Sequence, residues 1–268
     1  MLLHCQIKFG DKYLTIFRYF TLYKQLIGGG ISSGKINEYN TYKDFIHREW
    51  IIVDANTEES AIRDFISKHQ VVIAKPNNGE QGKGVEKINS GDAEKVEELL
   101  KSRKDVTYVM EECLMNAPEI AVINESSLNT IRCYTFIDKA GKTHILEMML
   151  RVGQAGSHVD NWGSGGVGYV FDKETGICSQ YGLDKLNRPY SFHPGSNVQM
   201  IGFKLPRFEE LKQYIYDLCS VNPKARYVGW DIAVTPDGFD LVEMNCPGGH
   251  DFLQAFGTPW GEFIKKNW

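Results

Sequence analysis

Apolar residues recur with two different spacings along this chain, and the spacings predict helices in some segments and strands in others. Residues 92–103 and 208–219 place their apolar side chains on one helical face, and residues 60–68 also have a helical pattern. Acidic residues early in 92–103 and basic residues late in it match the helix dipole. We therefore expect helices over these three segments.

Short runs rich in β-branched and aromatic residues predict the strands. In chain order they are VVIAK at 71–75, TYVMEE at 107–112, residues 130–137, residues 143–151, YVGWDIAV at 227–234 and FDLVEMN at 239–245. Turn residues at 139–141 and 235–238 predict that the last four runs form two hairpins. Eight glycines between 153 and 182 predict a loop, and residues before 48 have only a weak helical pattern.

Composition and charge exclude several classes of protein. With 42% hydrophobic residues among 268, the chain can bury a large core, which excludes disorder as its main state. The net charge is −4 and no long basic run occurs, so we expect no nucleic-acid partner. Six scattered cysteines without a C-x-x-C pair disfavour a zinc site and a disulfide scaffold. The cysteine pattern fits a reduced, cytoplasmic setting. Charges interrupt every apolar stretch, so we expect no membrane insertion.

A glycine-rich loop after the strand at 71–75 carries the first candidate chemistry. In AKPNNGEQGKGVEKI, Lys75 ends a strand and Lys83 lies among Gly79, Gly82 and Gly84. Backbone N–H groups of such a loop can approach phosphate oxygens, and the two lysines supply positive charge. The pattern favours a triphosphate site, although a plain hairpin with two solvated lysines would have the same sequence.

A second glycine motif, from Gly29 to Lys35, has the G-x-x-x-x-G-K spacing of a P-loop. Ile36 stands where that motif requires a serine or threonine for magnesium, and neither a clean strand before it nor a helix after it is evident. We therefore favour the loop around Lys83 as the phosphate site.

The predicted C-terminal hairpin can place three oxygen ligands on one face. Glu243 and Asn245 are two residues apart on one strand, and Asp231 falls opposite Val242 or Glu243, depending on whether the turn has a bulge. Two carboxylates and an amide oxygen suit Mg²⁺, whose other ligands are phosphate oxygens and water. Acids that simply face solvent are the alternative, but the neighbouring residues are apolar and an unpaired acid among them is costly. The hairpin is therefore a candidate magnesium site.

Two further segments carry candidate ligand-binding residues. The strand at 107–112 ends in Glu111 and Glu112, which are followed by Cys113 and Leu114. Backbone groups at such a strand end can pair with adenine, and a glutamate there can accept hydrogen bonds from ribose hydroxyls. Two glutamates that simply face solvent would have the same sequence. In the second segment, arginine side chains can donate paired hydrogen bonds to a phosphate or a carboxylate. A glycine-rich loop follows them and can fold over a bound ligand. An internal ion pair is the alternative for each arginine. The candidates in this segment are Asn129, Thr130, Arg132, Arg151, His158, Asp160 and Asn161.

Taken in this order, these features resemble the ATP-grasp superfamily. The resemblance consists of a strand lysine, a glycine-rich loop with its own lysine, a strand ending in paired glutamates and a terminal D…E-x-N hairpin, and it covers roughly residues 45–268. The amino-acid sequences of several segments are similar to those of the sugar-transfer-associated branch, which is found with bacterial surface-polysaccharide genes. The segments concerned are KDFIHREW, AKPNNGEQGKGVE, SSLNTIR, LRVGQAGSHVDNWGSGG and GWDIAVTPDGFDLVEMNCPGG.

The resemblance implies an α+β ATP-grasp fold with two α+β lobes that grip ATP. We expect an N-terminal helical segment at 1–44, a small lobe with the glycine-rich loop at 45–113 and a large lobe with the metal-binding hairpin at 114–268. Many members have a whole α/β domain in front, so the short N-terminal segment leaves acceptor recognition open.

The resemblance also implies roles for the candidate residues. Lys75, Lys83 and the loop glycines would bind the ATP phosphates, and the strand end from Glu111 to Leu114 would bind adenine and ribose. Arg132 and Arg151 would steady the transferred phosphoryl group or an acyl phosphate, which makes them catalytic together with Lys83. The implied magnesium ligands are Asp231, Glu243 and Asn245, and the substrate candidates are Asn129, Thr130, His158, Asp160 and Asn161.

The hypothesis that follows is an ATP- and Mg²⁺-dependent ligase that joins a small-molecule carboxylate to an amine through an acyl phosphate. Surface-polysaccharide or related metabolite biosynthesis is the expected setting, with sugar-linked substrates among the candidates. A kinase of a sugar or polyol hydroxyl, with Asp160 as base, is one alternative. A nucleotide-binding subunit without turnover is another. The sequence names neither the substrates nor the oligomeric state.

Overall fold

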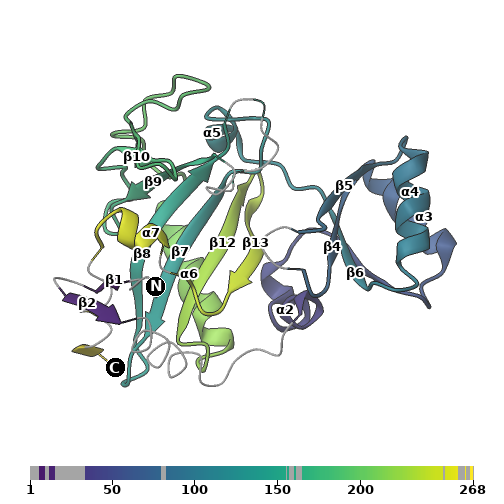
Figure 1. Cartoon of the computed structure of the whole chain (residues 1–268), viewed down its shortest axis with the longest axis horizontal. Coiled ribbons are helices and arrows are strands. Elements are labelled where there is room, and N and C mark those ends of the chain that lie inside the picture. Colours follow the sequence, from purple (N-terminus) through teal and green to yellow (C-terminus); the bar gives the residue numbers. More distant parts are fainter. Residues whose placement is uncertain are drawn as a thin grey trace, which may run out of the picture. The chain divides into compact units, whose positions relative to one another are not determined.

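Every pair of neighbouring strands in the described residues is antiparallel. The computed structural model describes residues 6–9, 12–15, 34–79, 83–154, 156, 160, 165–249, 251–258, 263, 266 and 267. The chain forms two compact units, which we call the smaller unit (Ile31–Leu114) and the larger unit (Met1–Gly30 with Met115–Trp268) (Figure 1). Both units contain helices and sheets, as predicted.

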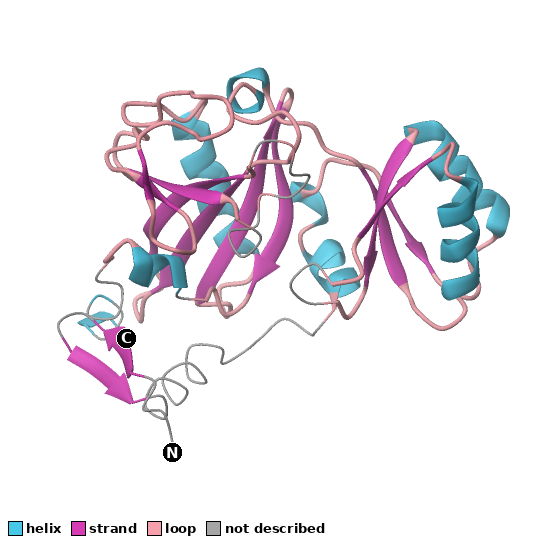
Figure 2. Ribbon diagram, turned by 45° about the horizontal axis from the view of Figure 1, so that its top comes forward, coloured by secondary structure: helices cyan, strands magenta, loops and turns pink. Residues whose placement is uncertain are grey.

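The smaller unit is a four-stranded sheet with helices on both faces. Its strand order is β3-β6-β4-β5, and Figure 2 shows its two longest helices against one face of the sheet. The apolar faces of these helices, α3 and α4, cover buried residues such as Val72 and Met110, so the predicted helical pattern is confirmed. The elements are α2 (Lys35–Thr41), a 3-10 turn (Lys43–Phe45), β3 (Trp50–Val53), α3 (Glu59–His69), β4 (Val71–Pro76), β5 (Glu86–Asn89), α4 (Ala93–Ser102) and β6 (Tyr108–Glu112).

The larger unit is built on a seven-stranded sheet of order β11-β10-β9-β8-β7-β12-β13. The predicted hairpins β7–β8 and β12–β13 are both present. The elements are β1 (Gln6–Phe9), β2 (Lys12–Thr15), α5 (Pro118–Ala121), β7 (Thr130–Ile137), β8 (Thr143–Val152), β9 (Val167–Phe171), β10 (Gly182–Leu183), β11 (Pro189–Tyr190), α6 (Phe208–Val221), β12 (Tyr227–Thr235), β13 (Gly238–Asn245) and α7 (Asp251–Ala255). None of the helices in the described ranges is long and apolar enough to cross a membrane.

The two faces of the seven-stranded sheet differ in chemistry. Helix α6 covers the apolar face, where the Trp230 indole donates a hydrogen bond of 2.8 Å to Oγ1 of Thr135 and Sγ of Cys219 lies 3.4 Å from the same oxygen. Because side chains alternate along a strand, Arg132 and Asp231 lie on the other face. We call this second surface the polar face.

Several segments differ from the sequence expectation. One is helix α2, which begins at Lys35, the last residue of the G-x-x-x-x-G-K spacing, where no helix was evident in the sequence. The glycine-rich stretch predicted as a loop contains β9, where Gly168 pairs with Arg151 and a Cβ on it would lie 3.1 Å from Sδ of Met149. This glycine therefore allows close packing within a strand rather than a turn. In the N-terminal segment, where we expected weak helix, Gln6–Phe9 pairs with Lys12–Thr15, and Ile7 and Phe9 alternate with polar residues as in a strand.

The predicted division at 1–44, 45–113 and 114–268 stays a prediction. In the structure, α2 belongs to the smaller unit with the residues up to Leu114. The part of the chain just before residue 45 is therefore part of a packed unit, and its contacts bear on the site described below.

The polar face holds one carboxyl group that is only half paired. Glu147 on β8 is 5% exposed, and one of its oxygens accepts a hydrogen bond from the hydroxyl of Thr258. Its other oxygen, Oε1, has no hydrogen-bond partner among the described residues. Burial raises the pKa of Glu147 to about 7. The hydrogen bond from Thr258 lowers this pKa, but by less than burial raises it.

We expect stability to fall with rising pH because of Glu147. Its folded-state pKa of about 7 lies above the unfolded value near 4.5, so between these values the folded protein keeps a proton that the unfolded chain has lost. Over this pH range, the difference in protonation of Glu147 lowers the free energy of unfolding by up to about 3 kcal/mol. Urea unfolding from about pH 5 to about pH 8 should show a steeper loss of stability for the wild type than for Glu147→Gln. The control is Glu174→Gln at an exposed position, and equal slopes for wild type and Glu147→Gln would contradict the assignment.

Candidate functional site

Strand register brings the predicted metal ligands together with an arginine on the polar face. Asp231 on β12 lies opposite Arg132 of β7 on one side and opposite Glu243 of β13 on the other. A register shift follows, since Ile232 pairs with Leu241, and Val242 is therefore the bulged residue. The bulge lies inside the strands rather than in the turn, and it places Asp231 and Glu243 on the same face.

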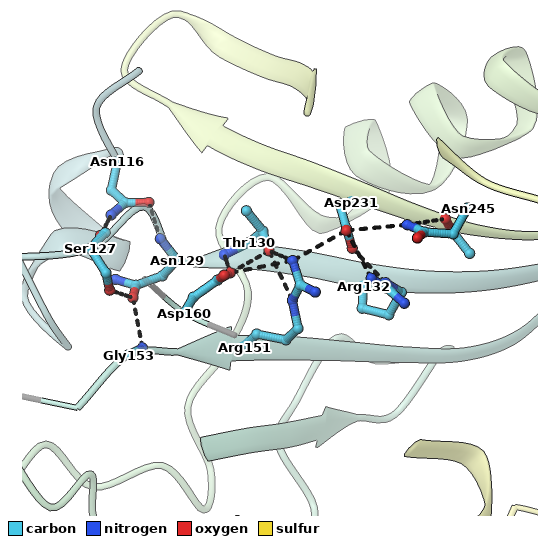
Figure 3. Close-up of polar contacts among 11 residues, drawn as sticks. Asn116, Ser127, Asn129, Thr130, Arg132, Arg151, Gly153, Asp160, Asp231 and Asn245 are labelled. Carbon is cyan, nitrogen blue, oxygen red and sulfur yellow. Dashed lines mark hydrogen bonds and ion pairs between the residues drawn. The ribbon is translucent and has the colours of Figure 1, made fainter. Parts of the chain in front are cut away.

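Asp231 is buried among cations. Arg132 donates from Nε to one carboxylate oxygen and from Nη2 to the other at 2.8 Å. Nη2 of Arg151 lies 3.2 Å from Oδ2, and Nδ2 of Asn245 donates to Oδ2 at 3.3 Å (Figure 3). Burial opposes the charge on Asp231, but the two guanidinium groups outweigh it and hold the pKa of this carboxyl below its usual range.

Arg151 links Asp231 to a second buried acid, Asp160. The Thr130 hydroxyl accepts hydrogen bonds from Nη2 (2.6 Å) and Nε (3.1 Å) of Arg151, and it donates to Asp160. The Thr130 backbone N–H also donates to Asp160 at 3.0 Å, and Arg151 lies 3.5 Å from the same oxygen. Burial raises the pKa of Asp160, although Arg151 and Thr130 act against the rise. Asp160 is thus the acid of this group that holds a proton more readily.

The predicted substrate residue Asn129 lies behind this group, with no exposed surface. Its side chain accepts from Oγ of Ser127 (2.7 Å) and from the Gly153 N–H (3.4 Å), and it donates to the carbonyl of Asn124 (2.6 Å). Figure 3 shows this network beside Thr130 and Asp160. Direct contact of Asn129 with a substrate would require the network to open, and the observed contacts instead brace the chain where it leaves β8.

In the smaller unit, Lys75 and Glu111 lie on the sheet face that carries α2. Nζ of Lys75 lies 2.6 Å from Oε1 of Glu111, and Nε of Arg48 lies 2.8 Å from Oε2. The Tyr39 hydroxyl also contacts Glu111, from helix α2. Burial opposes ionisation of Glu111, but Arg48 and Lys75 lower its pKa to about 2.

Sequence reasoning missed Tyr39 and Arg48. The signal that could have found them is the cost of a buried acid: a glutamate in the middle of a small sheet needs a cation besides one lysine. Arg48 stands two residues before Trp50, which pairs with Glu111, so the register places it within reach.

The ends of the glycine-rich loop approach each other closely. A Cβ on Gly79 would lie 2.9 Å from the Lys83 carbonyl, and Gly84 has φ +73° with Pro76 within 3.0 Å of the position of its Cβ. Lys83 itself is exposed. These contacts require glycine at both positions.

The remaining candidates are placed less directly. Glu112, Cys113 and Leu114 are half-buried at the end of β6. The Glu112 N–H donates to the Glu49 carbonyl at 2.9 Å, and Oε2 of Glu112 accepts from the Glu49 N–H at 3.3 Å. Gly82, His158 and Asn161 lie outside the described residues. The roles proposed for all of these residues stay predictions.

The donor set on the polar face fits a small hard cation. Asp231 and Glu243 supply carboxylates from paired positions, and Asn245, two residues along β13, contacts Asp231 through Nδ2, which leaves its carbonyl oxygen out of that contact. Within the described ranges, no three His, Cys, Asp or Glu side chains gather as a metal cluster. Mg²⁺ requires only one or two carboxylates when phosphate oxygens and water complete its shell, so the chemistry of this donor set suits Mg²⁺.

The family model described as sugar-transfer associated ATP-grasp matches residues 43–256. No curated protein matches the chain. Among solved structures, the ATP-grasp ligase PsnB complexed with minimal precursor is 13% identical with a TM-score of 0.52, covering 92% of this chain and 63% of its own. D-alanine–D-alanine ligase from Bacillus anthracis, complexed with ATP, is 16% identical with a TM-score of 0.53, covering 90% of this chain and 67% of its own.

A third structure, the ADP complex of purK, an N5-carboxyaminoimidazole ribonucleotide synthetase, is 10% identical with a TM-score of 0.52 and covers 82% of this chain and 46% of its own. The chain thus spans between about half and two thirds of the length of these three proteins. The likeness shows an ATP-grasp fold, and it confirms the predicted α+β fold class and the resemblance found in the sequence.

Asp231→Asn should destabilise the protein, because it leaves Arg132 and Arg151 without their shared counter-charge. Removing one partner of a buried ion pair costs roughly 3 to 5 kcal/mol. Chemical denaturation should detect this as a lower midpoint. Asp237→Asn in the exposed turn of the same hairpin is the matched control and should change little. Similar midpoints for both variants would show that the ion pairs contribute nothing to the fold.

Proposed function

The chain belongs to the sugar-transfer-associated ATP-grasp family, and on that premise we propose that it is an ATP- and Mg²⁺-dependent ligase that joins a carboxylate to an amine. The observation that carries the proposal is the row of Arg132, Asp231 and Glu243 across three paired strands. This row sets a guanidinium, a group suited to phosphate, beside two carboxylates. The names of the structural neighbours, which include two ligases and a synthetase, support the same class of reaction.

In the proposed reaction, a substrate carboxylate oxygen attacks the γ-phosphorus of ATP. The bond from that phosphorus to the bridging oxygen of ADP breaks, and an acyl phosphate forms. A substrate amine then attacks the acyl carbon, the nitrogen loses a proton, and phosphate leaves as the amide bond forms. The products are the amide, ADP and phosphate.

Arg132 and Arg151 bind the oxygens of the transferred phosphoryl group, because a guanidinium presents N–H donors in a planar fork. Asp231 holds both guanidinium groups in place before the substrate arrives, so that little reorganisation is needed in the transition state. Thr130 and Asp160 hold Arg151 from its other side. His158 and Asn161 are the proposed substrate-binding residues, and the buried Asn129 network supports the chain next to Thr130 and Asp160.

Asp231, Glu243 and Asn245 would hold Mg²⁺, which supplies positive charge against the β- and γ-phosphates when bound. Lys75, Lys83 and the glycines at 79, 82 and 84 bind the phosphates in this proposal. Backbone groups of the strand end from Glu111 to Leu114 pair with the adenine edge in this proposal, and a glutamate of that strand end accepts from the ribose hydroxyls.

A kinase of a sugar or polyol hydroxyl is the second candidate function. The observation in its favour is Asp160, a buried acid whose pKa is raised by its surroundings and which can accept a proton from a hydroxyl. A stable phosphorylated product that forms without any amine would favour the kinase. A nucleotide-binding subunit without turnover is disfavoured because the acidic pair on β12 and β13 is intact.

The biological setting is also part of the proposal. The family description supports a role next to sugar transfer, as in the assembly of cell-surface polysaccharide. Small-molecule acids and amines, including sugar-linked ones, are the proposed substrates. A cytoplasmic location is supported by the five free cysteines among the described residues and by the need for ATP.

Hydroxylamine can trap the acyl phosphate and tests the ligase directly. With ATP, Mg²⁺ and a panel of carboxylic acids, we expect an acid-dependent hydroxamate. Glu243→Gln removes one carboxylate charge but keeps the shape, so the rate should fall by at least about tenfold while nucleotide binding falls less. Asp237→Asn is the control. Failure of every acid to give hydroxamate, or a Glu243→Gln rate equal to the wild type, would contradict the proposal.

Lys75→Ala and Lys83→Ala should both impair the use of ATP, because each removes a cation that contacts phosphate, worth roughly 1.5 to 3 kcal/mol. We expect Lys75→Ala to weaken ATP binding and Lys83→Ala, in the exposed loop, to lower turnover more than affinity. Calorimetry and steady-state kinetics separate the two effects. Lys101→Ala on the exposed face of α4 serves as the control; if all three variants behave alike, the loop is only a hairpin.

A further inference from the structure

Three side chains of the smaller unit, those of Tyr39, Arg48 and Lys75, share the single carboxylate of Glu111. Both oxygens of Glu111 are used, Oε1 by Lys75 at 2.6 Å and Oε2 by Arg48 at 2.8 Å, with Tyr39 also bonded to Oε2. The Tyr39 hydroxyl in turn accepts hydrogen bonds from Arg48 (2.7 Å) and Lys75 (3.3 Å). The side chains of Arg48, Glu111 and Lys75 are 0%, 6% and 12% exposed. We call this group the Glu111 cluster.

The Glu111 cluster carries an excess positive charge. Arg48 and Lys75 contribute two cations, Glu111 contributes one anion, and burial keeps Tyr39 neutral by raising its pKa. A cation that shares its carboxylate with a second cation is only partly neutralised by it and keeps an attraction for a further anion. Lys75 is the most exposed of the three charged groups, so an anion would reach the cluster there.

Helix α2 also fixes the start of the glycine-rich loop. Oδ1 of Asn77, directly after β4, accepts from the Ile36 N–H at 3.0 Å, and the Asn77 carbonyl accepts from the Lys35 N–H at 3.0 Å. The same helix supplies Tyr39 to the cluster. The helix thus contacts the end of β4 through two sets of hydrogen bonds, on either side of Pro76.

We propose that Tyr39 and Arg48 are positioning residues for Lys75, and that Glu111 is the anchor of Lys75 rather than a ligand of the nucleotide ribose. Arg48 takes up part of the Glu111 charge, which leaves the Lys75 ammonium incompletely compensated and able to bind a phosphate. Tyr39 fixes the distance between the two cations. The inference rests on the proposed function, because it assigns these residues to the binding of ATP.

The first test is a double-mutant cycle on the affinity for Mg·ATP, measured by calorimetry. Arg48→Met lets Glu111 neutralise Lys75, so affinity should fall about tenfold. Lys75→Met should weaken binding at least as much, and the double variant should be no weaker than Lys75→Met alone. Arg48→Lys should restore part of the loss. Arg63→Met, which removes an exposed arginine paired to Glu59 and Glu97, is the control.

The second test separates an anchor from a ribose ligand. Glu111→Gln should leave the preference for ATP over 2′,3′-dideoxy-ATP unchanged, because the ribose does not contact this side chain. Loss of that preference in Glu111→Gln would overturn the anchor assignment.

Additive effects of Arg48→Met and Lys75→Met in the first test would overturn the positioning role. Tyr39→Phe, which removes only a hydroxyl, gives a milder variant if Arg48→Met fails to fold, and we expect it to weaken Mg·ATP binding several-fold.

A readout without nucleotide keeps this inference distinct from the proposed function. Acetic anhydride labelling of Lys75, followed by mass spectrometry, should be slower in Arg48→Met and faster in Glu111→Gln than in the wild type. This pattern supports the positioning role even if the wild type binds no Mg·ATP, a result that would refute the proposed function alone. Equal labelling rates in all three proteins would overturn the inference while leaving the proposed function standing.

Discussion

The pairing of a buried carboxylate with more than one cation is the interaction on which the proposed chemistry of this chain depends. Asp231 lies against Arg132 and Arg151 in the larger unit, and Glu111 lies against Arg48 and Lys75 in the smaller unit. An ionised carboxylate out of water is costly when it has no partner. Each sheet can therefore hold its acid only by holding the cations too, and these cations are the groups suited to phosphate.

Antiparallel register is what brings these partners together. Arg132, Asp231 and Glu243 occupy directly opposed positions on three neighbouring strands, and a bulge at Val242 sets the last of them. The opposite face of the same sheet is apolar and packs on α6, which fixes the alternation of side chains and prevents a one-residue slip. The core of the larger unit thus determines the geometry of its polar face.

Much of the fold and part of the site could be predicted from local sequence pattern. The hairpins, α3, α4 and α6 follow from spacing, and the face shared by Asp231, Glu243 and Asn245 follows from alternation along paired strands. The bulge position was left open because turn residues alone do not fix it. Strand β9 escaped detection because Gly168 serves close packing, which looks like a loop signal in the sequence.

The partners of Glu111 could not be predicted for a different reason. Tyr39 is 72 residues from Glu111 and Arg48 is 63 residues away, so no local spacing connects them. The contacts of Asn129 were hidden in the same way, because a buried amide and a substrate-binding amide have the same sequence signature. Such residues are identified by their burial and partners in the folded chain.

In the proposed function, the acid–cation pairs of each unit prepare cations for the phosphates of a nucleotide that binds with a magnesium ion. The most direct measurement is calorimetric titration of the wild-type protein with a non-hydrolysable ATP analogue, in the presence and absence of Mg²⁺. We expect a single class of binding site whose affinity for the analogue rises when Mg²⁺ is present. Absence of binding, or an affinity that Mg²⁺ does not change, would contradict it.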